Sequence, residues 1–380
     1  MAVPRFTKVV IGELENDIPP GAMNTFLAVG DINADGRPDI VLSGRHGRMA
    51  WFENPGAGGE WRRHLMADVR NMECGGQIVD LDGDGYADVV LGAEAGADEI
   101  WWWHNPGLHG GLWPRRTIAK TGGHQLHDAA IGDITGDCVT SLVFWNQRHG
   151  QPGGATLYRV ALPQDPTVSP WPGLEVIATG KEEDGQPEEG LSVADIDGDG
   201  HDELLAGTWW YKRAGGEWRA HKLVQGGYIT TRLAAGDLDG DGRLEVVVSE
   251  GDPCVYGRSR GRLAWFKPGE DIREPWQEHL LADDLLDAHT LRLANLCGSG
   301  RLDILTGEVG VARLYDERPP RLLIYENDGR GGFDPHVIDE GSGIHEGALA
   351  DLRGSGRLDI VGRPLHGPER WKLHVWYNEG

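Results

Sequence analysis

The sequence predicts an all-β fold: a seven-bladed β-propeller of four-stranded antiparallel blades, closed by an N-terminal strand that completes the last blade. The chain has 58 glycines and 21 prolines and no sustained helical periodicity, which favours short strands and tight turns. A small, apolar stretch leading through an acidic turn into a β-branched run recurs seven times, at intervals of roughly 40 to 60 residues. That interval is typical of propeller blades. The first turn residues are Asp31, Asp80, Asp133, Asp195, Asp237, Asn295 and Asp351.

The first repeat shows the expected strand order of one blade. Residues 26–32 (FLAVGDI) are predicted as the innermost strand and residues 38–44 (PDIVLSG) as its partner. Residues 48–54 (RMAWFEN) and 60–67 (EWRRHLMA) follow as the third and fourth strands. Apolar and β-branched residues bounded by glycine, proline and asparagine support each strand. We expect the other six repeats to follow the same order.

The ends of the chain indicate how the ring closes. Seven third strands but only six following fourth strands can be counted, because the chain stops just after HVWYNEG. Residues 5–12 (RFTKVVIG) have the pattern of the missing fourth strand, and we expect them to pair with the last blade. Such a pairing hides two strand edges. Residues 1–380 are therefore expected to form one domain.

The composition of the chain limits the classes of partner that it is expected to bind. The formal net charge of −24 argues against nucleic acid, because phosphates need a basic surface. No apolar run is long enough to span a bilayer, and MAVPRFTKVV lacks a secretory core. The chain is thus expected to be cytoplasmic as given, or secreted if it was trimmed, and a monomer or weak homo-oligomer. Its four cysteines lack CxxC spacing, so neither disulfides nor a zinc knuckle are indicated.

The acidic turns resemble a cation-binding loop. In the strong copies acidic or amide residues stand at turn positions 1, 3, 5 and 9, and this spacing is similar to the first part of an EF-hand loop, so structural Ca²⁺ is expected. The alternative is that the carboxylates only accept backbone N–H groups and fix the turn. The candidate metal ligands are Asp31, Asn33, Asp35, Asp39, Asp80, Asp82, Asp84, Asp88, Asp195, Asp197, Asp199, Glu203, Asp237, Asp239, Asp241 and Glu245.

The DxDGDGxxD turn after a small-residue strand resembles the FG-GAP or VCBS-type repeat of integrin-like propellers, across essentially the whole chain. Proteins with such repeats include propeller polysaccharide lyases, the propeller domain of aldos-2-ulose dehydratase and calcium-containing fungal lectins. The resemblance is specific for fold and weak for function.

Counting back six positions from each acidic turn predicts a cluster at one end of the central channel. Three histidines and one glutamate fall at this position, and equivalent positions in a closed ring point to the axis in similar ways. The candidate catalytic residues on this face are His127, His289, His345, Glu189, Glu308, Tyr228 and Arg232. The candidate substrate-binding residues are His124, Arg45, His46, Asn146, Arg148, Trp209, Glu250, Arg363 and His366. The histidines of the fourth strands are expected to pack on the outside: His64, His221, His279 and His336.

These residue types suit sugar chemistry. Nucleophile-elbow, P-loop and HExxH motifs are missing from the sequence. β-Elimination needs a base and a cation that holds the enolate oxygen, which histidine and arginine or a bound metal can supply. The resemblance to propeller lyases implies the same chemistry. We expect a carbohydrate lyase or dehydratase acting on a sugar or uronate, with the histidines as base, acid or ligands of Zn²⁺, Mn²⁺ or Mg²⁺.

Two alternatives remain open at this stage. A glycoside hydrolase could use the pair Glu250 and Glu308, whose separation would indicate its stereochemistry. A calcium-supported lectin would instead repeat sugar pockets between the blades.

Overall fold

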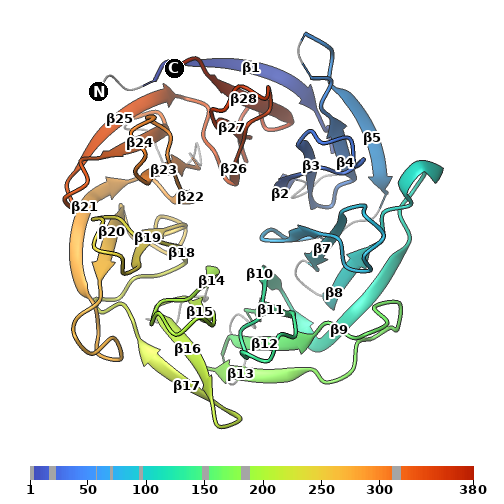
Figure 1. Cartoon of the computed structure of the whole chain (residues 1–380). Coiled ribbons are helices and arrows are strands. Elements are labelled where there is room, and N and C mark those ends of the chain that lie inside the picture. The colour runs from blue at the N-terminus through green and yellow to red at the C-terminus, as the bar shows by residue number, and fades with distance from the viewer. Residues whose placement is uncertain are drawn as a thin grey trace.

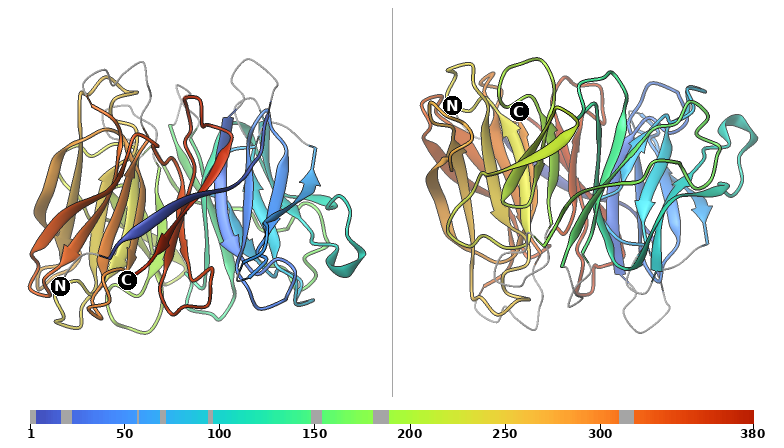
Figure 2. Two further views of the ribbon diagram at one scale, coloured as in Figure 1. Left: turned by 90° about the horizontal axis from the view of Figure 1, so that it is seen from above. Right: turned by 90° about the horizontal axis from the view of Figure 1, so that it is seen from below.

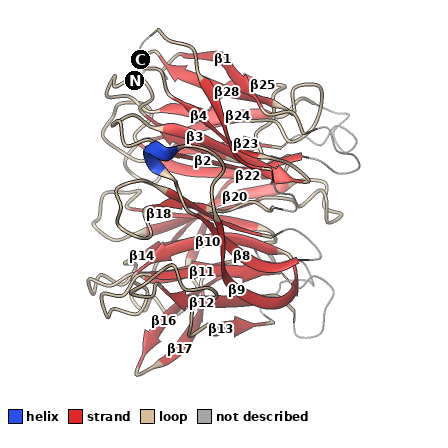
Figure 3. Ribbon diagram, turned by 90° about the vertical axis from the view of Figure 1, so that its right-hand side faces the viewer, coloured by secondary structure: helices blue, strands red, loops and turns tan. Residues whose placement is uncertain are grey.

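The computed structural model describes residues 4–16, 23–56, 58–68, 72–93, 97–147, 154–180, 189–309 and 318–380. Within these residues the chain forms seven four-stranded antiparallel sheets arranged around a central axis (Figure 1). The only helix there is one short 3₁₀ turn, η1 (Gly107–His109), and all other regular structure is strand (Figure 3). The predicted seven-bladed propeller is therefore confirmed.

Each blade runs outward from the axis, and its four strands follow one another in the chain, except in the last blade. The innermost strands are β2 (Met23–Gly30), β6 (Gln77–Val79), β10 (Leu126–Gly132), β14 (Leu191–Ala194), β18 (Thr231–Gly236), β22 (Ala288–Ala294) and β26 (Gly347–Ala350). The second strands are β3 (Asp39–Arg45), β7 (Asp88–Gly92), β11 (Ser141–Asn146), β15 (Glu203–Ala206), β19 (Glu245–Glu250), β23 (Asp303–Glu308) and β27 (Asp359–Gly362).

The third and fourth strands form the outer half of each blade. The third strands are β4 (Met49–Glu53), β8 (Ala97–Trp103), β12 (Thr156–Ala161), β16 (Trp209–Ala214), β20 (Gly261–Lys267), β24 (Arg321–Asn327) and β28 (Lys372–Asn378). The outermost strands are β5 (Arg62–Ala67), β9 (Arg115–His124), β13 (Glu175–Thr179), β17 (Glu217–Lys222), β21 (Gln277–Leu285), β25 (Phe333–Glu340) and β1 (Phe6–Glu13).

The first strand closes the ring. β1 pairs antiparallel with β28, with Phe6 opposite Asn378 and Val9 opposite Val375. The last blade therefore has the order β1-β28-β27-β26, and the two ends of the chain lie in one sheet (Figure 2). This pairing confirms the predicted closure and covers an edge of β28 that would otherwise be free.

In the described residues the core consists of seven large apolar clusters, each between two neighbouring blades, and one small cluster around Val309 and Leu365. Between blades 1 and 2, for example, Phe26 and Val41 pack with Val89, Leu91 and Trp103, all fully buried. Burial of each such side chain stabilises the folded state by about 1.5–3 kcal/mol compared with leaving it exposed to water. Because every cluster joins two blades, no blade has a separate core.

The ninth residue of most acidic turns stabilises the turn through a hydrogen bond from its backbone. In six blades a buried carboxylate, such as Asp39, accepts the backbone N–H of the second turn residue, here Ile32 at 3.0 Å. The equivalent bonds come from Leu81, Ile196, Leu238, Leu296 and Leu352 to Asp88, Glu203, Glu245, Asp303 and Asp359. This is the structural role that the sequence left as an alternative to calcium.

Asparagines after the third strands connect neighbouring blades. The Asn105 Nδ2 donates to the Ile32 carbonyl of blade 1 at 2.8 Å, and the Asn327 Nδ2 donates to the Leu238 carbonyl of blade 5 at 2.8 Å. Asn54 and Asn378 make the equivalent bonds to Leu352 and Leu296. Four blades are thus hydrogen-bonded to the preceding turn.

The outer histidines pack as expected. His64, His221 and His279 stack on Trp51, Trp210 and Trp265 at centroid distances of 4.2, 4.3 and 4.0 Å. The fourth, His336, lies 3.4 Å from a Glu326 carboxylate oxygen.

Candidate functional site

Three side chains from three blades meet at one end of the central channel. His127 lies on β10, Glu189 lies just before β14 and His289 lies on β22, and each is at most 4% exposed. One ligand atom of each lies within 4.8 Å of the others. The shared register of the innermost strands therefore brings together the side chains that the sequence placed in one ring.

Both imidazoles are oriented by an oxygen on Nδ1. The Nδ1 of His289 donates to the His345 carbonyl at 2.7 Å, and the Nδ1 of His127 lies 3.1 Å from an Asp128 carboxylate oxygen. A carbonyl can only accept, so Nδ1 of His289 carries the proton and Nε2 keeps its lone pair. The Nε2 of His127 lies 2.8 Å from the Cys74 sulfur and 3.9 Å from Glu189. Metal-ligating histidines are commonly oriented in this way.

Arg232 supplies positive charge to the same group. Its Nη1 lies 2.8 Å from a Glu189 carboxylate oxygen, and its Nη2 contacts the Nε2 of His289. The guanidinium thus lies between two of the three possible metal ligands.

The histidines differ in their electrostatic environment. Burial opposes protonation of His127, but the Cys74 sulfur and the Glu189 and Asp128 carboxylates outweigh it and raise its pKa well above the ordinary value. Burial and the Arg232 cation lower the pKa of His289 well below the ordinary value. His345 stacks on His289 at 3.8 Å, and burial with these neighbours also lowers its pKa. Imidazoles with opposite shifts are typical of functional sites.

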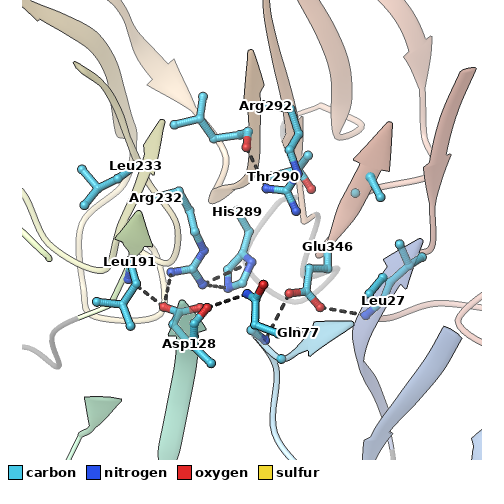
Figure 4. A pocket seen from close by; sticks show the side chains of 18 of the residues that line it. Leu27, Gln77, Asp128, Leu191, Arg232, Leu233, His289, Thr290, Arg292 and Glu346 are labelled. Atoms are coloured by element: carbon cyan, nitrogen blue, oxygen red, sulfur yellow. Dashed lines mark hydrogen bonds and ion pairs between the residues drawn. The ribbon is translucent and has the colours of Figure 1, made fainter. Parts of the chain in front are cut away.

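A cavity of about 350 Å³ adjoins this cluster. It follows the innermost strands along the axis, and His289, Arg232 and Asp128 line it (Figure 4). Glu346 and Arg292 line the same cavity. Asp128 stands one position after the histidine ring, so examining that next position in each repeat would have found it.

The histidines are more deeply buried than an open channel mouth implies. The loop after β19 lies beside them: an Asp252 carboxylate oxygen is 3.6 Å from the Nε2 of His289, and the backbone N–H of Cys254 donates to Asp287. Burial, with Glu189 and Asp287 nearby, raises the pKa of Asp252 to about 8. Tyr256 of this loop is near enough to Glu189 and His127 to interact electrostatically, and no sequence pattern indicated it.

Two predicted arginines lie near the cluster. Arg45 pairs with Glu73, with 2.7 Å between Nη2 and the carboxylate. Arg363 is fully buried, and its Nη2 lies 3.4 Å from the Nδ1 of His345, while its Nε and Nη1 have no hydrogen-bond partner among the described residues. Burial lowers the pKa of Arg363 to about 10. His46 and His366 are half-buried in the loops after β3 and β27.

Glu250 and Glu308 form ion pairs with arginines of their own blades. Arg258 and Arg262 bind Glu250 at 2.8 and 3.0 Å. Arg318 and Arg321 bind Glu308 at 2.6 and 3.0 Å in the same way. Each carboxylate also accepts a backbone N–H from the loop before its inner strand. Neither joins the histidine cluster.

Other predicted site residues also pack within blades. The Tyr228 hydroxyl donates to Glu278 at 2.6 Å, and the Asn146 amide donates to Thr121 at 2.9 Å. The Lys222 ammonium lies 4.7 Å from the ring centroid of Trp209. Arg148 and the side chain of His124 lie outside the described residues.

The family model for FG-GAP-like repeats matches residues 80–144 and 195–248. The chain carries FG-GAP-like repeats. A similar solved structure is the crystal structure of BBS1N in complex with ARL6DN, soaked with lead, at 8% identity and a TM-score of 0.56. The similarity covers 99% of this chain and 98% of that one, and it concerns the fold alone. No curated protein sequence matches the chain. None of the helices in the described residues has the length and apolar character needed to cross a membrane.

Lysines occupy the acidic turns of two FG-GAP-like repeats. Lys212 contacts Asp197 and lies 2.6 Å from Asp199 and 3.0 Å from Glu203. Lys267 binds the equivalent carboxylates Asp239, Asp241 and Glu245 in the next blade. Each lysine follows a residue that pairs with the neighbour of the ninth turn residue: Tyr211 pairs with Leu204, and Phe266 pairs with Val246. In these two turns an ammonium group therefore already provides the charge that calcium would bring.

The turns of blades 1 and 2 differ. In blade 1 the residue after Phe52, which pairs with Ile40, is Glu53 and not a lysine, and Arg37 contacts Asp35. In blade 2 the His104 ring lies 3.0 Å from Asp82.

Proposed function

We propose that the chain is a metal-assisted carbohydrate lyase or dehydratase that carries out β-elimination in the axial cavity. The observation that carries this proposal is the orientation of His127 and His289. The Nδ1 of each imidazole lies beside an oxygen, and one ligand atom of each histidine lies within 4.8 Å of a Glu189 carboxylate oxygen. Three protein ligands with an open position are typical of catalytic zinc sites. A divalent ion there would polarise a carboxylate or ketone oxygen of the sugar.

The residues around the cluster suit the other needs of elimination. In this reaction a base removes the proton next to a carbonyl or carboxylate, the β C–O bond breaks, and water or an alcohol leaves. Arg232 lines the cavity and can hold the developing oxyanion. Glu346 lines it too, and burial raises the pKa of its carboxyl group, which makes the carboxylate a stronger base.

The alternatives find less support. Glu250 and Glu308 are each bound by two arginines of their own blade, so this pair is not available for glycoside hydrolysis. The cluster residues also differ from blade to blade, whereas a multivalent lectin would repeat its pocket. Calorimetry with a bound sugar should therefore give about one equivalent per chain, and several equivalents would favour a lectin.

The decisive experiment combines elemental analysis with an elimination assay. Purified protein should contain about one equivalent of a transition metal such as zinc or manganese, and His127→Ala and His289→Ala should each lose it, because ligand loss weakens such sites severely. Both variants, and the chelated wild type, should lose the ultraviolet absorbance of unsaturated product formed from a panel of uronates and keto-sugars.

The matched control is His279→Ala, which removes an imidazole stacked on Trp265 on the outer strand. It should keep both metal and activity. Full elimination activity in the chelated protein or in His289→Ala would refute the metal-assisted mechanism.

A further inference from the structure

Arg292 presents a half-buried cation to the axial cavity. It lies on β22, three residues after His289, and lines the cavity with its guanidinium (Figure 4). Its Nη1 donates to the carbonyl of its own neighbour, Leu291, at 2.8 Å. Within the described residues it makes no ion pair. The guanidinium therefore keeps most of its donors available to an occupant of the cavity.

The two carboxylates that share the cavity, Glu346 and Asp128, accept hydrogen bonds from backbone N–H groups. Glu346 accepts the backbone N–H groups of Leu27 and Gly75 at 2.8 and 3.1 Å. Asp128 accepts the Gly190 N–H at 2.6 Å and lies beside His127. Burial lowers the pKa of Arg292, and the nearby carboxylates do not offset it. Glu346 and Asp128 are thus near enough to favour the charged guanidinium, but within the described residues neither forms an ion pair with it.

The surrounding ring leaves room for a ligand at this level. In every repeat the residue three positions before the acidic turn belongs to an innermost strand, and Arg292 is the single charged one. Its equivalents are Ala28, Gln77, Ala130, Ser192, Ala234 and Ala348. The cavity volume of about 350 Å³ is at the small end of the range for ligand pockets, which suits one sugar unit better than a long chain.

We propose that Arg292 is an anion subsite that selects a monosaccharide-sized substrate carrying a carboxylate, sulfate or phosphate group. This proposal rests on the proposed function, because it assumes that the occupant is the sugar that reacts beside His289. A guanidinium binds such groups through two parallel charge-assisted hydrogen bonds. The sugar would lie along the axis with its acidic group at Arg292 and its reacting carbons toward the histidine cluster.

Binding should be measured on chelated protein, so that no turnover occurs. Isothermal titration with D-glucuronate, glucose 6-sulfate, glucose 6-phosphate and D-glucose distinguishes the three anions from one another and from a neutral sugar. We expect at least one anion to bind about tenfold or more tightly than D-glucose, as one charge-assisted hydrogen bond predicts.

Two variants test the residue itself. Arg292→Met should abolish the preference for the anion, and Arg292→Lys should keep part of it. Arg330→Met is the matched control, because Arg330 is exposed in the loop between β24 and β25. It should bind like the wild type. An unchanged anion preference in folded Arg292→Met or, failing its folding, equal binding of all four probes by the wild type would overturn the subsite.

The two proposals fail in different ways. Arg292-dependent anion binding without elimination of any acidic sugar would refute the lyase and leave the subsite standing. Elimination whose KM for acidic sugars is the same in wild type and Arg292→Met would refute the subsite and leave the lyase standing.

Discussion

Buried carboxylates have two different functions in this chain, and their surroundings distinguish them. Asp39 accepts backbone N–H groups from Ile32 and Asn54 and fixes an acidic turn. Glu189 instead meets an arginine and two histidines at the axis. Both kinds of carboxylate are equally buried, so burial alone does not identify a functional acid. The partner side chains from other blades do.

The pH dependence of Asp39 follows from its burial. Burial raises the pKa of Asp39 from 3.8 to about 7, although the two N–H donors lower it. Between these values the folded protein holds a proton that the unfolded chain has released, so the free energy of unfolding falls as the pH rises through this window. Asp39→Asn removes this contribution but weakens one hydrogen bond at every pH.

We therefore expect Asp39→Asn to be more destabilising at pH 5 than at pH 8, with a loss of about 1–3 kcal/mol at pH 5. Urea unfolding at both values checks this, with the exposed Asp283→Asn as the control. A larger loss at pH 8 would contradict the assignment.

At the scale of the element, the acidic turn is a single structural unit with two ways of balancing its charge. Lys212 and Lys267 extend from third strands to the turns of blades 4 and 5. The turn of blade 1 has an acid at the equivalent strand position. An ammonium ion and Ca²⁺ compete for the same oxygens, so calcium should prefer the turn without a strand lysine.

The double variant Lys212→Met and Lys267→Met should consequently bind more calcium than the wild type, by up to two equivalents in calorimetry. In chelator at low ionic strength it should also be less stable, by about 1 kcal/mol or less for each lost surface ion-pair network. Lys222→Met, on the outer strand of blade 4, is the control. Unchanged calcium stoichiometry in the double variant would show that the lysines do not exclude the ion.

On the scale of the whole molecule, closure of the ring positions everything else. The cluster combines side chains from blades 3, 4 and 6, and its geometry exists only while all seven blades keep their spacing. β1 holds the ring through its pairing with β28, although the two strands lie at opposite ends of the sequence. A change at β1 should therefore affect the distant axial site.

Deleting residues 1–13 should lower the thermal midpoint by several degrees and promote aggregation, because the deletion exposes the edge of β28. A synthetic peptide of residues 4–16 added in trans should restore both properties by strand addition, and a scrambled peptide should not. Size-exclusion chromatography and calorimetry would measure this. A truncated protein as stable as the full chain would show that closure does not depend on β1.

Much of the architecture could be predicted because it is local. The repeated turn, the alternation of strand residues and the count of third and fourth strands are all properties of neighbouring residues. They gave the number of blades, the closure by residues 5–12 and the outer histidine packing, all of which the structure confirms. The register argument also brought His127, Glu189 and His289 together correctly.

The remaining site depended on contacts between blades that no local pattern encodes. Glu250 and Glu308 look like free acids in the sequence, and only the fold reveals their arginine partners. Asp128 and Tyr256 joined the site through the approach of strands and loops far apart in the chain. The repeat itself thus determined the ring, because each blade has the same local pattern of strand and turn residues. The tertiary structure decided which charges meet at the axis, because that depends on how seven unequal blades pack against one another.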